Sequence, residues 1–378
     1  MTQPPVVRSP RVVLGMTLFN NARHLPDAAA SVLSQSHPDF ALVMLDDGSS
    51  DDTPAIAQAL AASDARIKYF RHEKRAGLIP TWREVVDIAL REFPSAHYFA
   101  WTSDHDRWHP RWLGRLLEVL DQNPSVVLAY PLTQRIEPDG TPVDKELRTF
   151  ETVGIADVRE RWRHFCLRGV GAGDMVYGLM RVSALRAAGI FREVMNPDRL
   201  LIAELTLQGE IAQVPEPLWV RRRANVASIA RQRTTLIAGP TPAWFAWPAT
   251  VQHAYVITRQ YALSSHPPVR IARATLLGML ARYQTSSLWR TYRKTEAAKQ
   301  LERTREQVSF AAKVSTKQAR GAAANTMDGA VMAWVRLGRY RRKLVYESGF
   351  WLRKLGTRTR RVQQRARFKI GTALRRVR

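Results

Sequence analysis

The chain has 378 residues, one cysteine and a formal net charge of +25 at pH 7. The single cysteine, Cys166, excludes an internal disulfide and favours a reducing compartment. The apolar content of 45% is ordinary for a globular protein, and the length predicts two or more structural units.

The positive charge lies in the last part of the chain. Residues 1–230 hold 27 Lys and Arg against 28 Asp and Glu, whereas residues 231–378 hold 31 against 5. The first part is therefore close to neutral and the second carries the whole excess. This asymmetry predicts two units with different roles, the second of which favours an anionic surface.

The pattern predicts no membrane-spanning segment. The first residues lack a charged region followed by an apolar run, so we expect no signal peptide. Residues 234–258 carry no formal charge, but Gly239 and three prolines interrupt them. A spanning helix needs about 20 predominantly apolar residues in a row.

Strands and helices are expected to alternate through the first half of the chain. Apolar runs predict strands at 11–18, 40–45, 66–70, 98–102 and 126–130, and apolar periodicity predicts helices at 25–36, 78–91 and 111–120. Another helix begins near Thr53, because Pro54 suits a first helical turn. This order favours an α/β fold, a mostly parallel, Rossmann-like sheet flanked by helices. Neither a G-x-G-x-x-G motif after the first strand nor a Walker loop is present, which argues against a dehydrogenase or a P-loop NTPase.

Acidic residues follow two of the predicted strands. Asp46 and Asp47 come directly after the second strand, and Asp104 and Asp106 follow the fourth, just before Pro110. Ligands bind at the carboxyl edge of open α/β sheets, and paired carboxylates suit Mg²⁺ or Mn²⁺ bound to a diphosphate. The alternative is a solvated acidic turn before the helix that begins near Pro110.

Several short motifs occur in a characteristic order. They are Thr17-Leu-Phe19-Asn20, Ser34-Gln35-Ser36, Asp46-Asp47-Gly48-Ser49-Ser50-Asp51-Asp52-Thr53, Gly77-Leu78, Asp104-His105-Asp106 with Pro110, and Pro197-Asp198 upstream of Leu205 and Gly209. On these motifs the chain resembles the family 2 glycosyltransferases, which have the GT-A fold, over about residues 11–223. The resemblance implies transfer of a sugar from a nucleotide-diphosphate donor to a hydroxyl, with inversion at the anomeric carbon.

The resemblance also assigns a donor-binding set. Asp47 corresponds to the position that bonds the nucleobase, Thr17 and Phe19 flank the base, and Arg75 lies near the diphosphate. The donor-binding set is completed by Asn20, Asp46 and Asp104.

The implied metal ligands are Asp104 and Asp106, with Mg²⁺ or Mn²⁺ as the cation. They stand six and four residues before Pro110, which departs from the usual spacing and leaves the main ligand open. His105 could be a third ligand, although a residue between two acids more often faces the other way.

Asp198 corresponds to the catalytic base, with Pro197 in place of the usual glutamate. The alternative for Asp198 is an N-cap of the helix that follows. Glu204 is expected to be structural, because it lies more than half a turn round the helix from Asp198. Asp174 could approach the acceptor or serve as a turn residue, and residues 221–223, three arginines, could contact an anion or form a solvated strand end.

We divide the chain into a GT-A domain (1–230), a helical extension (231–290) and a basic amphipathic tail (291–378). Trp334 and Trp351 interleave with the arginines of the tail, so the tail could lie on an anionic membrane, bind nucleic acid or remain solvated. The membrane is favoured, since enzymes of this family commonly act on lipid-linked acceptors, and we do not expect nucleic acid as a partner.

The resulting hypothesis is a metal-dependent glycosyltransferase that is cytoplasmic and peripheral at the inner face of the membrane. Its acceptor would be a lipid-linked glycan or an envelope polysaccharide precursor. The alternative is a non-catalytic scaffold that binds sugar nucleotides at the membrane.

Overall fold

A computed structural model describes residues 10–143, 149–169, 172–222, 235–240 and 242–289. Contacts divide the chain into two compact units, Met1–Arg290 and Thr291–Arg378. All described residues belong to the first unit. The predictions for the basic tail, including Trp334 and Trp351, and for Arg223 lie outside the described residues.

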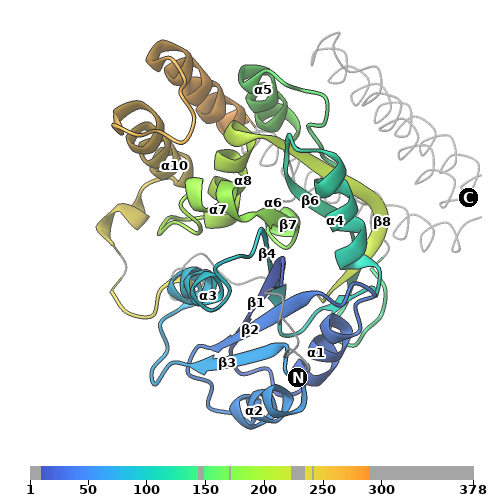
Figure 1. The fold of residues 1–378 in the computed structure, drawn as a ribbon. Helices are drawn as coiled ribbons and strands as arrows, with labels where there is room; N and C mark the ends of the chain where they lie inside the picture. The colour runs from blue at the N-terminus through green and yellow to red at the C-terminus, as the bar shows by residue number, and fades with distance from the viewer. Residues whose placement is uncertain (1–9, 144–148, 170–171, 223–234, 241, 290–378) are drawn as a thin grey trace, which may run out of the picture. The chain divides into compact units, whose positions relative to one another are not determined.

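The first unit is built on one eight-stranded sheet (Figure 1) with the order β3-β2-β1-β4-β7-β6-β8-β5. Strands β3, β2, β1 and β4 are parallel, and β7 is antiparallel to both β4 and β6. β8 runs parallel to β6, and β5 pairs antiparallel with β8. The strands are β1 (Val12–Leu18), β2 (Phe40–Asp46), β3 (Ile67–Arg71), β4 (Tyr98–Ser103), β5 (Arg107–Trp108), β6 (Val126–Ile136), β7 (Leu179–Arg181) and β8 (Glu210–Arg222).

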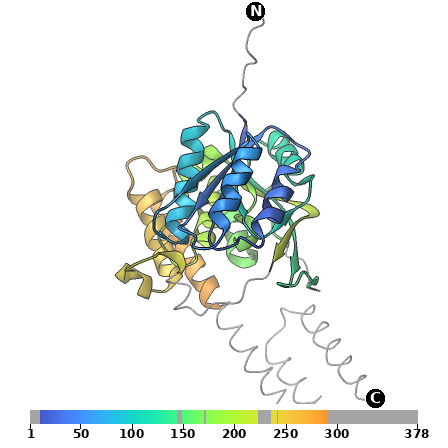
Figure 2. The same cartoon turned by 90° about the horizontal axis from the view of Figure 1, so that it is seen from below.

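Helices cover both faces of the sheet (Figures 1 and 2). They are α1 (Leu25–Leu33), α2 (Thr53–Ser63), α3 (Leu78–Glu92), α4 (Trp112–Gln122), α5 (Val158–Arg168), α6 (Ala172–Met175), α7 (Val182–Ala187), α8 (Pro197–Gln208) and α10 (Ala249–Ile257). A 3₁₀ helix, η1 (Ala243–Ala246), precedes α10, and a π-helical segment, η2 (Thr258–Leu263), follows it. Residues 273–289 are also helical.

The alternation of side chains along each strand sorts the apolar residues into two cores. Val12, Leu14 and Met16 of β1 pack in a cluster with residues of α1, α2 and α4. Val13 and the side chains of α3, α5 and α8 form the other cluster, which also takes in Phe245 and six later residues: Ile257, Tyr261, Leu276, Met279, Leu280 and Tyr283. The segment after β8 therefore packs on the same core as the sheet.

The predicted GT-A architecture is confirmed. The apolar runs at 211–214 and 218–220, which Pro215 and Pro217 separate in the sequence, belong to one strand, β8. β8 pairs with β6 up to Val214 and again from Trp219. Pro215 and Pro217 therefore lie in a short stretch that does not pair with β6. The glycine-rich stretch after α5 forms the four-residue helix α6 and is followed by β7.

None of the helices in the described part of the chain combines the length and the apolarity that crossing a bilayer requires.

Candidate functional site

The candidate site lies at the carboxyl ends of the central parallel strands. In the register of the sheet, Leu18 of β1 pairs with Asp46 of β2, and Thr17 pairs with Ser103 of β4. The Asp46-Asp47 turn and the Asp104-His105-Asp106 turn therefore leave the sheet at the same level. This is the edge at which open α/β sheets bind ligands.

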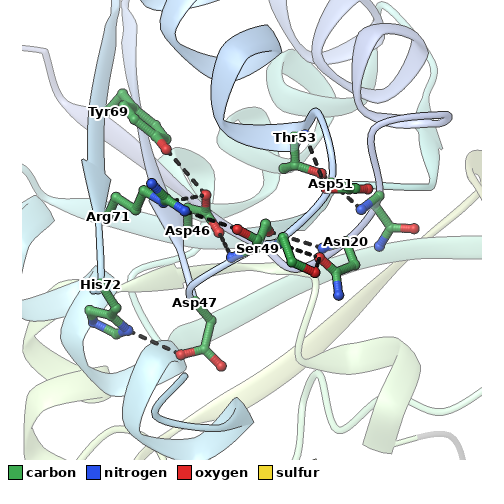
Figure 3. Close-up of polar contacts among 11 residues, drawn as sticks. Asn20, Asp46, Asp47, Ser49, Asp51, Thr53, Tyr69, Arg71 and His72 are labelled. Atoms are coloured by element: carbon green, nitrogen blue, oxygen red, sulfur yellow. Dashed lines mark hydrogen bonds and ion pairs between the residues drawn. The ribbon is translucent and has the colours of Figure 1, made fainter. Parts of the chain in front are cut away.

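Asp46 is fully buried and holds the turn after β2 in place (Figure 3). Its Oδ1 accepts a hydrogen bond from the Ser49 amide at 2.8 Å, and its Oδ2 accepts one from the Tyr69 hydroxyl at 3.2 Å. Burial, together with the nearby charge of Asp46, raises the pKa of Tyr69 to about 12. Both oxygens of Asp46 are engaged, so the geometry gives this donor-set residue an anchoring role in the turn.

Asn20 joins the loop after β1 to the same turn. Its amide donates to Ser49 Oγ at 3.0 Å, and its Oδ1 accepts from the Ser50 amide at 2.8 Å. The backbone of Asn20 has φ 51°, a left-handed conformation that asparagine tolerates well. The contacts of Asn20 therefore fix the two loops against each other (Figure 3).

Asp47 faces the loop that leads into α3. It accepts hydrogen bonds from the amides of Ala76 at 2.7 Å and Gly77 at 2.9 Å, and His72 Nδ1 lies 3.0 Å from its Oδ1. Burial opposes protonation of His72, but its hydrogen bonds to Asp47 and Glu84 outweigh burial and raise its pKa.

Three predicted donor-binding residues meet at this place. The Arg75 guanidinium lies 4.4 Å from the centre of the Phe19 ring, and its Nε is 3.8 Å from Asp47 Oδ2. Thr17 lies at the end of β1, two residues before Phe19. The structure therefore brings an aromatic face, a cation and a carboxylate together at the sheet edge.

Asp104 is buried and receives hydrogen bonds on both oxygens. Its Oδ2 accepts from the Phe19 amide at 3.1 Å and from Asn21 Nδ2 at 2.9 Å, and its Oδ1 lies 2.7 Å from His105 Nδ1. Asp104 thus connects the turn after β4 to the loop after β1.

Asp106 is 2% exposed, and its Oδ1 accepts from the Arg222 amide at 2.8 Å. Burial raises the pKa of Asp106, opposed by the charges of His105 and Arg221. His105 lies between the two acids, with its Nε2 3.9 Å from Asp106 Oδ1. The expectation that His105 faces away is wrong, because hydrogen bonding to Asp104 holds the ring on the side of the acids.

Asp198 lies in the first turn of α8. The N-cap is Asn196 and Pro197 begins the helix, so the alternative that Asp198 is the cap does not hold. Burial raises the pKa of Asp198, opposed by the Arg199 amide and by the charges of Arg199 and Arg221.

Asp198 and Arg221 approach the same point from two elements. A Cβ added to Gly173 would lie 3.3 Å from Asp198 Oδ2 and 3.7 Å from Arg221 Nη1. Tyr177 lies within electrostatic range of Arg221, Asp106, Asp104 and Asp198, and burial raises its pKa above the usual range. The predicted base and the predicted metal ligands therefore all lie within electrostatic range of one tyrosine.

Arg221 is held by a buried ion pair. Asp174 is 4% exposed and accepts from Arg221 Nη1 at 2.7 Å, and its other oxygen accepts from Arg135 Nη2. Arg221 also donates to the Gly173 carbonyl at 2.9 Å and stacks on Trp219 at 5.3 Å. Asp174 thus acts as an anchor for arginine.

The other residues singled out in the sequence, Glu204 and Arg222, make contacts of their own. Glu204 is fully buried within α8 and pairs with Arg192 at 3.1 Å, in keeping with a structural role. Arg222 donates to the carbonyls of His105 and Pro138. Sequence reasoning missed His72, Arg135 and Tyr177, because none of them stands in a motif.

Asp104 and Asp106 offer carboxylate oxygens to a hard divalent cation, but too few to hold it by themselves. Among the described residues, no group of three or more His, Cys, Asp or Glu could hold a metal ion. Mg²⁺ in proteins is commonly bound by one or two carboxylates together with substrate phosphates, so Asp104 and Asp106 supply enough oxygen ligands only with a diphosphate present. Asp106 is the better candidate, because both oxygens of Asp104 already accept hydrogen bonds from the chain.

The parallel half-sheet, its antiparallel continuation through β7 and the acidic loops at its edge define a GT-A domain. Residues 14–168 match the model of the family described as Glycosyl transferase family 2. This part of the chain is therefore similar to that family.

Curated relatives each match part of the chain. A putative teichuronic acid biosynthesis glycosyltransferase, TuaG of Bacillus subtilis, is 27% identical over 149 residues, which cover 39% of this chain and 57% of TuaG. A GalNAc(5)-diNAcBac-PP-undecaprenol beta-1,3-glucosyltransferase of Campylobacter jejuni is 36% identical over 64 residues, or 17% of this chain and 21% of that protein. The chain thus spans little more than half of the first relative.

Among solved structures, residues 1–349 of S. aureus TarS in complex with UDP-GlcNAc align with a TM-score of 0.54 and 14% identity. The alignment covers 73% of this chain and 72% of that one. At this identity the likeness concerns the fold alone.

Proposed function

We propose that this protein transfers a sugar from a nucleotide-diphosphate sugar to a hydroxyl acceptor with inversion at the anomeric carbon. The match of residues 14–168 to the family model and the GT-A fold support this reading. The observation that carries it is the position of Asp198. Its carboxylate meets Arg221 beside Gly173, in a group that also includes Asp104, Asp106 and Tyr177. An inverting transfer needs such a base facing the acid-lined edge that holds the diphosphate.

In this proposal Asp198 accepts the proton of the acceptor hydroxyl at a carboxylate oxygen as the new bond forms. Burial raises the pKa of Asp198 and so makes it a stronger base than an exposed aspartate, and the charges of Arg199 and Arg221 favour its ionised form. Asp174 fixes the Arg221 guanidinium beside it. The base therefore needs no rearrangement of its neighbours before it acts.

Donor binding would use the other end of the same edge. Phe19 offers a ring to the nucleobase, and Arg75 stacks on that ring within reach of a phosphate. The contacts of Asp47 with Ala76 and Gly77 fix the loop that carries Arg75. Asp106, with Asp104 beside it, would hold Mg²⁺ or Mn²⁺. When bound, such an ion would neutralise charge on the departing nucleoside diphosphate.

The acceptor in this proposal is a lipid-linked glycan or an envelope polysaccharide precursor. Two relatives support it by their descriptions, one in teichuronic acid biosynthesis and one acting on an undecaprenol-linked glycan. We further propose a peripheral place at the inner face of the membrane, with the basic tail of residues 291–378 on anionic lipid. The alternative is a non-catalytic scaffold that binds sugar nucleotides, and the experiment below distinguishes it from an enzyme.

The test compares the wild type with Asp198→Asn, using a panel of nucleotide sugars with Mn²⁺. We expect donor hydrolysis to fall by roughly 10²–10⁴-fold, the usual contribution of a general base. Donor affinity in calorimetric titration should stay unchanged. Glu160→Gln is the matched control, since Glu160 is an exposed acid in the first turn of α5 that forms an ion pair with Arg163.

Unchanged hydrolysis in Asp198→Asn would refute the assigned base. A wild type that binds donors and never hydrolyses or transfers them, with any acceptor offered, would favour the scaffold.

A further inference from the structure

A row of exposed apolar side chains runs along α10 and its flanks. Trp247 is 53% exposed, Val251 41%, Tyr255 48% and Leu263 66%. Val251 and Tyr255 are four residues apart in α10, which places them on one side of the helix, and Trp247 lies two residues before the helix begins. In Figures 1 and 2 this segment, coloured gold to brown, lies at the outer margin of the unit. We name Trp247, Val251, Tyr255 and Leu263 the α10 row.

The opposite side of α10 already has its partners. Gln252 and His253 are fully buried, and Gln252 accepts from the Met195 amide at 2.9 Å. His253 lies 2.7 Å from the Tyr283 hydroxyl. The α10 row is therefore not needed for packing. Trp244 extends it, because its ring lies 5.9 Å from that of Tyr255. Contiguous exposed apolar side chains on a soluble domain mark an interaction surface.

The charge around the row has one sign. No Asp or Glu occurs from Pro217 to Thr295, a stretch that holds the row and twelve Lys or Arg. Arg259, Arg270 and Arg273 are exposed in the described part of this stretch. The Arg259 guanidinium lies 5.9 Å from the centre of the Tyr255 ring, so a cation borders the aromatic residues directly.

We propose that the α10 row docks on an anionic phospholipid surface. Trp and Tyr rings favour the boundary between acyl chains and headgroups, where one end of the ring is apolar and the other wet. Arginines beside them reach the phosphates, and each cation near such a surface adds electrostatic attraction. A short helix with these two features lies in the plane of the interface.

Charge argues against two other occupants. A second copy of the chain would bring an equally acid-free stretch against this one, because a two-fold contact joins like surfaces. The tail of residues 291–378 is strongly basic and offers few acids to neutralise the arginines. An anionic bilayer satisfies both the apolar row and its cations.

This inference does not rest on sugar transfer. It concerns the α10 row and not the tail of residues 291–378. The test uses the full chain with a cysteine placed at Val251 or, as the matched control, at Leu167. Leu167 is a leucine of α5 with 58% exposure, next to Arg168. The native Cys166 is 1% exposed and should not react with a thiol probe in the folded protein. The unsubstituted protein reports any background labelling.

Each variant is labelled with an environment-sensitive fluorophore. It is then mixed with phosphatidylcholine vesicles, with or without phosphatidylglycerol, and with vesicles carrying a quencher at a shallow depth in the acyl region. We expect the probe on V251C to shift to the blue and be quenched with anionic vesicles, and to change less with neutral ones. The probe on L167C should not respond.

Two results would overturn the proposal. If the protein floats with anionic vesicles while the probe on V251C stays unchanged, the tail alone makes the contact. If that probe shifts without vesicles and in proportion to protein concentration, a second copy covers the row. Donor binding, measured on the same samples, reports separately on the proposed function.

Discussion

Glu204 gives a stability prediction that the structure lets us work out in sign and size. Its side chain is fully buried in α8, where Oε1 contacts Arg192 Nη2 at 3.1 Å. Its Oε2 has no hydrogen-bond partner. Burial raises the pKa of Glu204 to about 7 from 4.5, because the Arg192 contact offsets only part of the lost hydration.

The folded protein therefore binds a proton at Glu204 more tightly than the unfolded chain does. Between about pH 4.5 and pH 7 the free energy of unfolding falls as pH rises, and above that window the loss is complete. At about 1.4 kcal/mol per pKa unit, the loss amounts to ~3 kcal/mol. Glu204→Gln keeps an acceptor for Arg192 but cannot ionise, so it should lack this slope.

The assay is urea unfolding of wild type and Glu204→Gln at about pH 5 and pH 8. The stability of the variant relative to wild type should rise by ~2–3 kcal/mol between the two pH values, whatever the constant offset from the altered Arg192 contact. Glu160→Gln, an exposed change, should give no such rise. A difference between Glu204→Gln and wild type that is independent of pH would refute the reasoning.

Two further predictions concern the loops at the sheet edge. Gly77→Ala should destabilise the protein by about 1–3 kcal/mol more than Gly140→Ala. Both glycines have φ near +100°, so the backbone strain is similar at the two positions. An added Cβ would lie 2.6 Å from the Ala238 amide nitrogen at Gly77, but would meet nothing within 4 Å at Gly140. Equal destabilisation of the two variants in denaturant unfolding would contradict this prediction. If Mn²⁺ strengthens the binding of a nucleoside diphosphate as proposed, Asp106→Asn should abolish that effect in calorimetric titration, and Asp104→Asn should reduce it less, because Asp104 is already occupied by hydrogen bonds from the chain. A larger effect at Asp104 would reverse the assignment.

The sheet and most of its helices could be predicted, because burial on both faces leaves continuous apolar runs in parallel strands. The stretch around β8 could not. Pro215 and Pro217 indicate a break in any strand pattern, yet the pairing resumes at Trp219 after the skipped residues. Whether a proline ends a strand or only interrupts its ladder depends on the neighbouring strand, which sequence periodicity does not describe.

The position of the acids could be predicted for a simple reason. Parallel strands in register end at the same edge, so Asp46 and Asp104 had to lie near each other once β1, β2 and β4 were assigned. What each acid does there could not be predicted. Asp46 and Asp47 are neighbours of the same type, but Asp46 accepts from Ser49 and Tyr69 while Asp47 accepts from Ala76 and Gly77.

The role of Asp174 was also beyond prediction from the sequence. Asp174 accepts from Arg135 of β6 and Arg221 of β8, and these arginines pair directly across the sheet. Two cations side by side on neighbouring strands repel unless a buried carboxylate lies between them, so Asp174 is required by the pairing of β6 with β8. No local pattern indicates that requirement, because the three residues are 39 and 47 positions apart. If Asp198 is the base, the pairing of β6 with β8 places the Arg221 charge near it. The pKa of Asp198 then depends on two strands that carry none of the family's motifs.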